Sequence, residues 1–154
     1  MKQKTIVVVT ATLLSMTTAY AQNAGSNAPC AGLPSHAALK TALTAARGQG
    51  NGGFNLDMWG TIVDRDGTVC AVAFTGTDRG DQWPGSRVIS AQKANTANAF
   101  SLPGLVLSTA NLYTATQSGG SLFGLQHSNP VNTSVAYGGE SKNFGQQNDP
   151  NGGR

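Results

Sequence analysis

One stripe of a predicted helix combines a cation and a hydroxyl with large apolar side chains. At 100° per helical residue, four side chains fall within about 60° of one another, namely Ile89, Lys93, Thr96 and Phe100. An ammonium group among apolar groups is costly unless an anion meets it. The stripe therefore predicts a pocket in which Lys93 binds a ligand carboxylate and Thr96 offers its hydroxyl. The alternative is a surface helix whose lysine stem covers apolar surface and whose threonine bonds to the preceding turn.

The helix that carries this stripe follows a predicted β-hairpin. Apolar and polar residues alternate in 56–63 and again in 69–74. The Asp-Gly step within 64–67 suits a tight turn between two antiparallel strands. After a polar loop, the sequence predicts a helix from 87 to about 100, with Ser86 as its N-cap.

Two further helices and a third strand complete the expected α+β fold, an antiparallel sheet flanked by helices. The first helix is expected after its N-cap Ser35 and ends at Gly48. A shorter helix is expected over 105–116, and a short strand over 121–125. Residues 126–154 show no usable period, and long irregular runs are uncommon in compact domains. Either this tail is disordered or the chain stops before the fold is complete, and we favour the second explanation.

Residues 1–21 have the pattern of a cleaved signal peptide. Two lysines precede an apolar run over 6–16 that is too short to span a bilayer, and a small-x-small site follows at 19–21. Residues 22–32 form a flexible lead-in to a single domain over 33–154. These features predict export to the periplasm or out of the cell, with no membrane span.

The charge balance argues against nucleic acid as a partner. The 154 residues include 10 basic and 7 acidic ones, and two of the basic residues lie in the predicted signal peptide. No basic run follows residue 21, so the electrostatic footprint of a nucleic-acid binder is absent from the sequence. No heptad or other repeat is present either, which excludes a coiled coil.

The two cysteines of the chain, Cys30 and Cys70, predict one disulfide bond. An even count in an exported chain favours a bridge, and two cysteines allow a single intramolecular pairing. The alternative is two separate buried thiols. A metal site is disfavoured, because neither cysteine has a partner at the Cys-x-x-Cys spacing of zinc sites.

The predicted stripe lies within a motif that resembles a known family. Ser86 and the run Ala-Gln-Lys-Ala-Asn-Thr-Ala over 91–97 resemble the S…A-x-K-A-x-T-A signature of the haem-binding GlcG/HbpS family, which is also found as the C-terminal domain of PduO-type proteins. Residues 39–46 resemble the first helix of that family, and 61–67 resemble its VVD-x-x-G hairpin. The resemblance covers about 33–125. Family members continue with glycine-rich strands and a last helix, so we expect this sequence to be truncated at its C-terminus.

The resemblance implies an α+β fold, assembly into homo-oligomers, and haem as the bound cofactor. Exported members of the family are linked to haem capture or redox sensing. Haem needs an apolar slot, a cation for its propionates and an iron ligand. Lys93 and Thr96 are the first choices for ligand contact, with Ile89 and Phe100 beside them. The residue types that could bind the iron are His36, Met58, Tyr113, His127 and Tyr137.

Each possible iron ligand also has an ordinary structural role. His36 is expected in the first turn of a helix, His127 in the exposed tail, Met58 in the core and Tyr113 in packing. Trp59 and Trp83 could stack on a porphyrin, although a core position and a loop anchor are the simpler roles for them.

The sequence contains no recognisable catalytic motif. Gly-x-Ser-x-Gly, the P-loop and His-Glu-x-x-His are all absent. Three functions remain open at this point. The first is an exported haem-binding protein, the second a haem-degrading or corrinoid-related enzyme, and the third a structural or interaction module without a ligand.

Overall fold

A two-stranded antiparallel sheet with helices on both faces forms the centre of the fold. The computed structural model describes residues 28–50, 54–127 and 130–152. Strand β1 (Trp59–Val63) pairs with β2 (Val69–Phe74). The helical elements, in chain order, are α1 (His36–Arg47), α2 (Ser86–Phe100), η1 (Thr109–Leu112), α3 (Tyr113–Thr116), η2 (Leu125–His127), α4 (Thr133–Ala136) and η3 (Ser141–Asn143).

This arrangement confirms the α+β class and the hairpin. The predicted signal peptide and residues 22–27 of the predicted lead-in lie outside the described residues. Within the part of the chain that the structure describes, no helix is both long enough and apolar enough to cross a bilayer.

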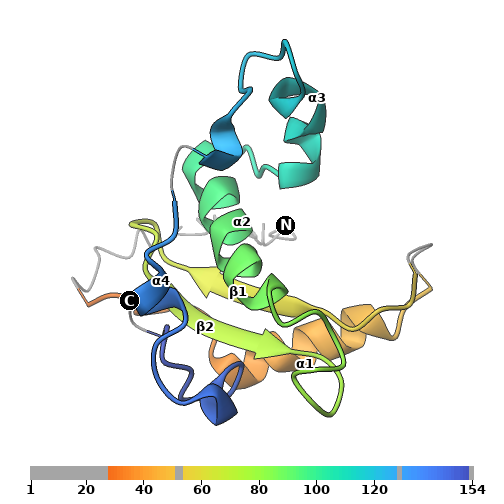
Figure 1. Cartoon of the computed structure of the whole chain (residues 1–154), viewed down its shortest axis with the longest axis vertical. Helices are drawn as coiled ribbons and strands as arrows, with labels where there is room; N and C mark the ends of the chain where they lie inside the picture. Colours follow the sequence, from red (N-terminus) through yellow and green to blue (C-terminus); the bar gives the residue numbers. More distant parts are fainter. Residues whose placement is uncertain (1–27, 51–53, 128–129, 153–154) are drawn as a thin grey trace, which may run out of the picture.

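Helices α1 and α2 cover opposite faces of the sheet (Figure 1). A Cβ atom on Gly60 would lie 2.6 Å from the Leu43 side chain of α1. The next residue, Thr61, meets Ser90 of α2 through hydroxyl oxygens 2.6 Å apart. Successive strand residues point to opposite faces, so these two contacts place the helices on either side of β1. Glycine is needed at position 60 because α1 packs directly on the backbone there.

The hairpin is shorter at its open end than the alternation predicts. Strand β1 begins at Trp59, not at residue 56. The reason is the side chain of Thr75, whose Oγ1 accepts from the Met58 backbone N–H at 2.9 Å and donates to Asp57 at 2.7 Å. The backbone pairing continues for one more bond, from the Thr75 N–H to the Met58 carbonyl oxygen at 2.9 Å, and side-chain bonds replace the regular ladder beyond it.

The two longest helices differ in how they begin. Ser35 caps α1 as predicted, because its hydroxyl accepts from Ala38 N, and Gly48 ends the helix. The predicted N-cap Ser86 is wrong. Ser86 is the first residue of α2, and the cap residue Gly85 makes no side-chain bond. The Ser86 N–H is instead bonded to the Trp83 carbonyl oxygen in the preceding turn.

Residues 101–127 form an arm that extends beyond the C-terminal end of α2 (Figure 1). The predicted helix over 105–116 is reduced to η1 and α3. Leu102 and Leu105 exchange two backbone hydrogen bonds of 2.9 Å across a turn, so the chain reverses where the helix was expected to start. The predicted strand over 121–125 is also wrong, because consecutive turns occupy these residues and none of the described strands pairs with them.

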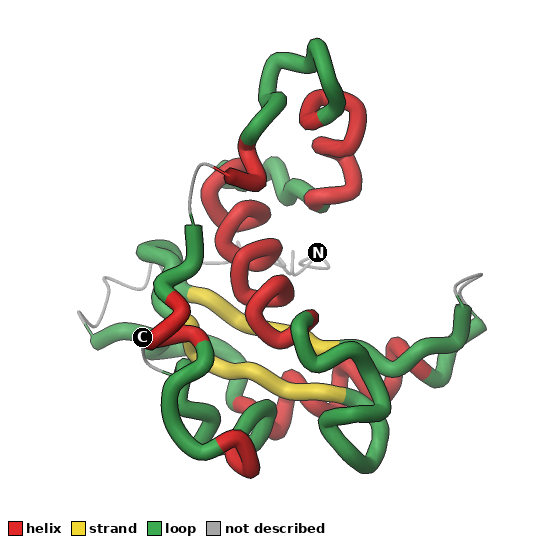
Figure 2. The backbone as a smooth tube through the Cα atoms, in the orientation of Figure 1, coloured by secondary structure: helices red, strands yellow, loops and turns green. Residues whose placement is uncertain are grey.

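The segment after the arm is rich in loops but packs against the core (Figure 2). The alternative of a disordered tail is therefore wrong for residues 130–152. Phe144 lies against the buried cluster of Trp59, Val72 and Phe74. The sequence pattern gave no sign of this packing, because a single aromatic anchor among Gly, Asn and Gln has no period.

A buried ion pair fixes the same segment to α2. The guanidinium of Arg87 donates through Nε and Nη2 to both oxygens of Asp149, and each side chain is only 2% exposed. Arg87 also donates to the Ala136 carbonyl oxygen at 2.7 Å and stacks 3.9 Å from the Phe144 ring. We call this set of contacts the Arg87–Asp149 clasp.

The predicted disulfide is present. Cys30 and Cys70 are bonded, with Cα atoms 5.4 Å apart. The bridge joins the segment before α1 to strand β2. It closes a loop of 41 residues, for which chain entropy gives a stabilisation of about 4 kcal/mol.

Candidate ligand-binding cleft

The stripe of α2 borders a cleft of about 880 Å³. One wall is α2, and the others come from the arm and from the segment that leads into α4. The size is within the roughly 300–1,000 Å³ typical of small-molecule sites. The large apolar side chains on its walls include Val69, Val88, Ile89, Leu112, Val131 and Val135.

Three of the four predicted contact residues line this cleft. Ile89, Lys93 and Thr96 are on its α2 wall, whereas Phe100 is not among the lining residues. Phe100 is the last residue of α2, one turn beyond Thr96. The predicted stripe therefore extends past the end of the cleft.

The two polar residues of the stripe differ in their availability. Lys93 is exposed, and no described carboxylate lies within ion-pair distance of its ammonium. The Thr96 hydroxyl donates to the Gln92 carbonyl oxygen at 3.0 Å, the local bond expected for an ordinary surface helix. A ligand can therefore meet the charge of Lys93 and the lone pairs of Thr96.

A smaller hollow of about 490 Å³ lies on the other side of the same stripe. Ile89 and Lys93 border it too, together with the carboxylates of Asp57 and Asp81. Two carboxylates disfavour an anionic ligand there. The larger cleft has no acidic residue among its lining residues, so it suits a ligand that carries carboxylates.

The charge of Asp81 is secured by its surroundings. The backbone N–H groups of Asp78 and Thr77, and then the Thr77 hydroxyl, donate to its carboxylate and lower its pKa. Asp81 therefore stays ionised beside the smaller hollow. This strengthens the preference of an anionic ligand for the larger cleft.

The residue types that can bind iron are scattered, and one of them lines the cleft. Tyr113 is on the arm wall and is 70% exposed. His36 lies on α1, where its Nε2 meets the Gly145 carbonyl oxygen at 2.8 Å. Met58 lines the smaller hollow, and His127 and Tyr137 are exposed residues that do not line the cleft.

The two tryptophans take different positions. Trp59 packs in the core, with its ring centroid 5.1 Å from that of Phe74, and Trp83 is 68% exposed. Both line the smaller hollow and neither lines the larger cleft. The porphyrin-stacking alternative therefore does not apply to the larger cleft.

Sequence reasoning missed much of the cleft wall. Tyr113 was expected to pack, yet it is a largely exposed wall residue. Val131 and Val135 belong to the segment for which no period was found. The available signal was the apolar character of two valines in a segment without a period, which is too weak to place the segment.

The lining residues form a binding surface more readily than a catalytic one. No histidine, cysteine or carboxylate lines the larger cleft among the described residues. Nucleophile–base pairs and metal-activated water therefore have no residues there to build on. No family model, curated protein or solved structure matches this chain.

Proposed function

We propose that this protein is an exported haem-binding protein that captures, stores or senses haem in the periplasm or outside the cell. The cleft of about 880 Å³, with Lys93 and Thr96 on one wall, is the observation that carries the proposal. The resemblance of 91–97 to the GlcG/HbpS signature supports the same ligand. The Cys30–Cys70 disulfide supports export, because such bonds persist in oxidising compartments.

The residues of the cleft fit haem by size and chemistry. Haem is a large, flat, apolar ring with two carboxylates at one edge, so it needs apolar walls and a cation at the rim. Val88, Ile89 and Leu112 supply apolar wall, and Lys93 supplies an exposed ammonium for a propionate. Bound haem would supply redox-active iron, and the chain would bind, orient and shield it.

Tyr113 is the residue that we propose as the iron ligand. It carries the only phenol among the lining residues, and no described histidine, methionine or cysteine lines the cleft. A tyrosine oxygen serves as the haem ligand in some proteins. We expect Tyr113→Phe to change the visible spectrum of the bound haem, whereas Lys93→Ala is expected to change the affinity alone.

A hemin titration followed by absorbance tests the proposal. We expect the mature protein to give a saturable Soret shift. Lys93→Ala should weaken binding by up to about fivefold, because an exposed ion pair contributes up to roughly 1 kcal/mol. Lys142→Ala is the matched control, since Lys142 is 77% exposed and lies outside the cleft.

Two results would contradict the proposal or redirect it. If the spectrum of hemin with the protein is the same as in buffer, the proposed function is wrong. Loss of the Soret band over time with a reductant, together with formation of an open-chain tetrapyrrole, supports the haem-degrading enzyme instead.

A second candidate function, an interaction module, is favoured by the apolar surface of the arm. Four large apolar side chains there are 55–91% exposed, namely Leu102, Leu105, Val106 and Phe123. Clustered exposed apolar residues mark interaction sites, and a homo-oligomer is the partner that we propose. Light scattering should then give a mass above that of one chain, and Val106→Ser should lower it. A monomer over the micromolar range would contradict this candidate.

A further inference from the structure

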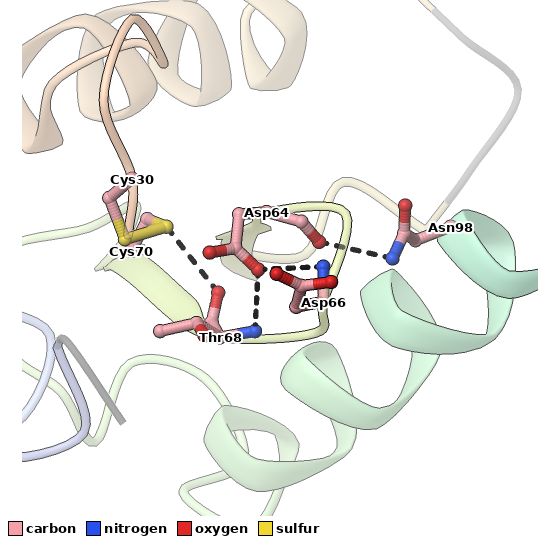
Figure 3. The surroundings of a disulfide bond; sticks show 6 residues. All are labelled: Cys30, Asp64, Asp66, Thr68, Cys70 and Asn98. Atoms are coloured by element: carbon pink, nitrogen blue, oxygen red, sulfur yellow. Dashed lines mark hydrogen bonds between the residues drawn. A yellow bond between two sulfur atoms is a disulfide. The ribbon is translucent and has the colours of Figure 1, made fainter. Parts of the chain in front are cut away.

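The disulfide has a carboxylate beside it. The two sulfur atoms of Cys30 and Cys70 and a carboxylate oxygen of Asp64 all lie within 4.8 Å of one another. All three residues are partly buried. Figure 3 shows Asp64 at the turn between the two strands, with its side chain on the side of the bridge. Together they offer three ligand atoms of two types that zinc accepts, cysteine sulfur and carboxylate oxygen.

Asp64 is held in place by contacts that do not involve the bridge (Figure 3). Its Oδ1 accepts from the backbone N–H groups of Asp66 at 3.0 Å and Thr68 at 2.8 Å. Its backbone carbonyl oxygen accepts from Asn98 of α2 at 3.0 Å. Because none of these bonds uses a cysteine, the carboxylate keeps its position when the disulfide is broken. Its Oδ2 has no hydrogen bond among the described residues.

We propose that reduction of the Cys30–Cys70 bridge creates a zinc site formed by the two cysteine thiolates and Asp64. A dithiol transfers two electrons and two protons to the bridge and becomes a disulfide itself, which leaves two thiols on this chain. Zn²⁺ then replaces the two thiol protons, which pass to solvent. Water occupies the fourth position of a tetrahedral ion with three protein ligands.

The distances require only local movement. With Zn–S near 2.3 Å and Zn–O near 2.0 Å, tetrahedral geometry places the sulfurs about 3.8 Å apart and each sulfur about 3.5 Å from the oxygen. The three ligand atoms already lie within 4.8 Å of one another. The sulfurs separate after reduction, and the carboxylate moves by about 1 Å. Rotation of the cysteine side chains supplies most of this change.

The metal would take over the role of the disulfide. Cys70 is fixed by the pairing of β2, and Asp64 by its turn. Around Cys30, the described backbone hydrogen bonds are those of the short turns at 28–33. Reduction therefore releases the segment before α1, and zinc ligation ties it to the sheet again. The spacing of the cysteines in sequence does not indicate this site, because the hairpin turn brings the third ligand to it.

The test compares oxidised and reduced protein with Zn²⁺ and Co²⁺ as probes. The mature protein is reduced with a phosphine, which is then removed under anaerobic conditions. Zinc affinity is measured by competition with a chromophoric chelator. We expect tight 1:1 binding to the reduced protein only, with thiolate-to-metal and tetrahedral absorption bands when Co²⁺ is used.

Asp64→Asn and Asp66→Asn form a matched pair of variants. Asn at position 64 keeps an oxygen that can accept the two backbone N–H groups but replaces Oδ2 with an amide nitrogen. We expect it to weaken zinc binding by about tenfold or more, because even the loss of a group that only positions a metal ligand costs about tenfold or more. Asp66→Asn makes the same charge change in the same turn, outside the ligand group, and should bind zinc like the wild type.

If the reduced chain loses structure, circular dichroism can test the proposal by measuring whether zinc restores the fold. In that case zinc should restore the signal of the wild type and of Asp66→Asn, but not that of Asp64→Asn. Equal affinity of all three reduced proteins, or equal zinc binding by oxidised and reduced protein, would overturn the proposal. A reduced wild type that neither binds zinc nor regains structure with it would overturn it as well.

Discussion

The Arg87–Asp149 clasp is the contact whose loss we expect to destabilise the fold most. Asp149→Asn removes the negative charge with little change in volume. The Arg87 guanidinium then remains 2% exposed without its counter-ion. Breaking a buried ion pair from one side typically costs about 3–5 kcal/mol, because a buried charge is left uncompensated.

The hydrogen bonds of Asp149 place the expected effect within this range. Its carboxylate accepts from Arg87 through two nitrogens, from Gly145 N at 2.6 Å and from Asn151 N at 2.9 Å. An asparagine can accept with one oxygen, so at least part of this set is lost. The free energy of unfolding of a typical protein is about 5–15 kcal/mol. For a protein near the middle of that range, the variant would lose about a third or more of it.

Urea unfolding followed by circular dichroism measures this loss. With a slope of about 1–3 kcal/mol per molar urea, a loss of 3 kcal/mol lowers the midpoint by roughly 1–3 M. The matched control is Glu140→Gln, which breaks a pair whose side chains are 72% and 77% exposed. That change should cost less than about 1 kcal/mol.

The double variant Arg87→Met with Asp149→Leu completes the experiment. Replacing both charges with apolar groups removes the uncompensated charge, so the double variant should be more stable than Asp149→Asn. A midpoint for Asp149→Asn within error of the Glu140→Gln control would refute the reasoning. It would mean that the clasp is hydrated or absent in solution.

Three further predictions concern the disulfide, the core and the stability at acidic pH. Replacing both Cys30 and Cys70 with Ser should lower the free energy of unfolding, measured in urea, by about 2–5 kcal/mol. A loss below about 1 kcal/mol would contradict a stabilising role of the disulfide. Phe74→Ala should lower the free energy of unfolding by about 3–5 kcal/mol, because Phe74 is 3% exposed. Phe54 is 93% exposed, so Phe54→Ala should change this free energy by no more than about 0.5 kcal/mol. Equal losses in the two variants would contradict the assigned core. Hydrogen bonds in the folded state lower the pKa of Asp81. The ionised Asp81 therefore stabilises the fold at pH values above the ordinary carboxyl pKa, and this stabilisation is lost as the pH falls through the pKa of Asp81 in the folded protein. Asp81→Asn should therefore flatten the fall of the melting temperature in acid, and an NMR titration that gives an ordinary or raised pKa would contradict this.

The elements with strong local signals were predictable from sequence. The period of α1, its cap Ser35 and its stop at Gly48 act within a few residues of one another, and all three are confirmed. The hairpin was predictable for the same reason, since alternation and an Asp-Gly turn specify it locally. The disulfide followed from the cysteine count.

The C-terminal half was not predictable, because its structure depends on distant contacts. Arg87 and Asp149 are 62 residues apart, and neither shows a pattern that marks it as buried. The helix expected over 105–116 had a fair apolar period, but the paired backbone of Leu102 and Leu105 turns the chain there. A local turn at Leu102–Leu105 and distant contacts such as the Arg87–Asp149 pair thus override the helical period in this half of the chain.

The candidate site was predictable in part. The helical period brings Ile89, Lys93 and Thr96 to one wall of the cleft, as the stripe predicted. Tyr113 could not be assigned to the same cleft, because its position depends on the fold of the arm. Phe100 has the right angle on the helix but lies beyond the end of the cleft.

The Arg87–Asp149 clasp also has a thermodynamic consequence for any ligand of the cleft. Ala136 and Asn151 belong both to the surroundings of the clasp and to the wall of the cleft. Docking of the C-terminal segment and occupancy of the cleft are therefore linked equilibria, and each must favour the other by the same free energy. A ligand at a hundred times its dissociation constant adds about 2.7 kcal/mol to the global stability. The C-terminal segment would share in that gain and become slower to exchange its amide hydrogens.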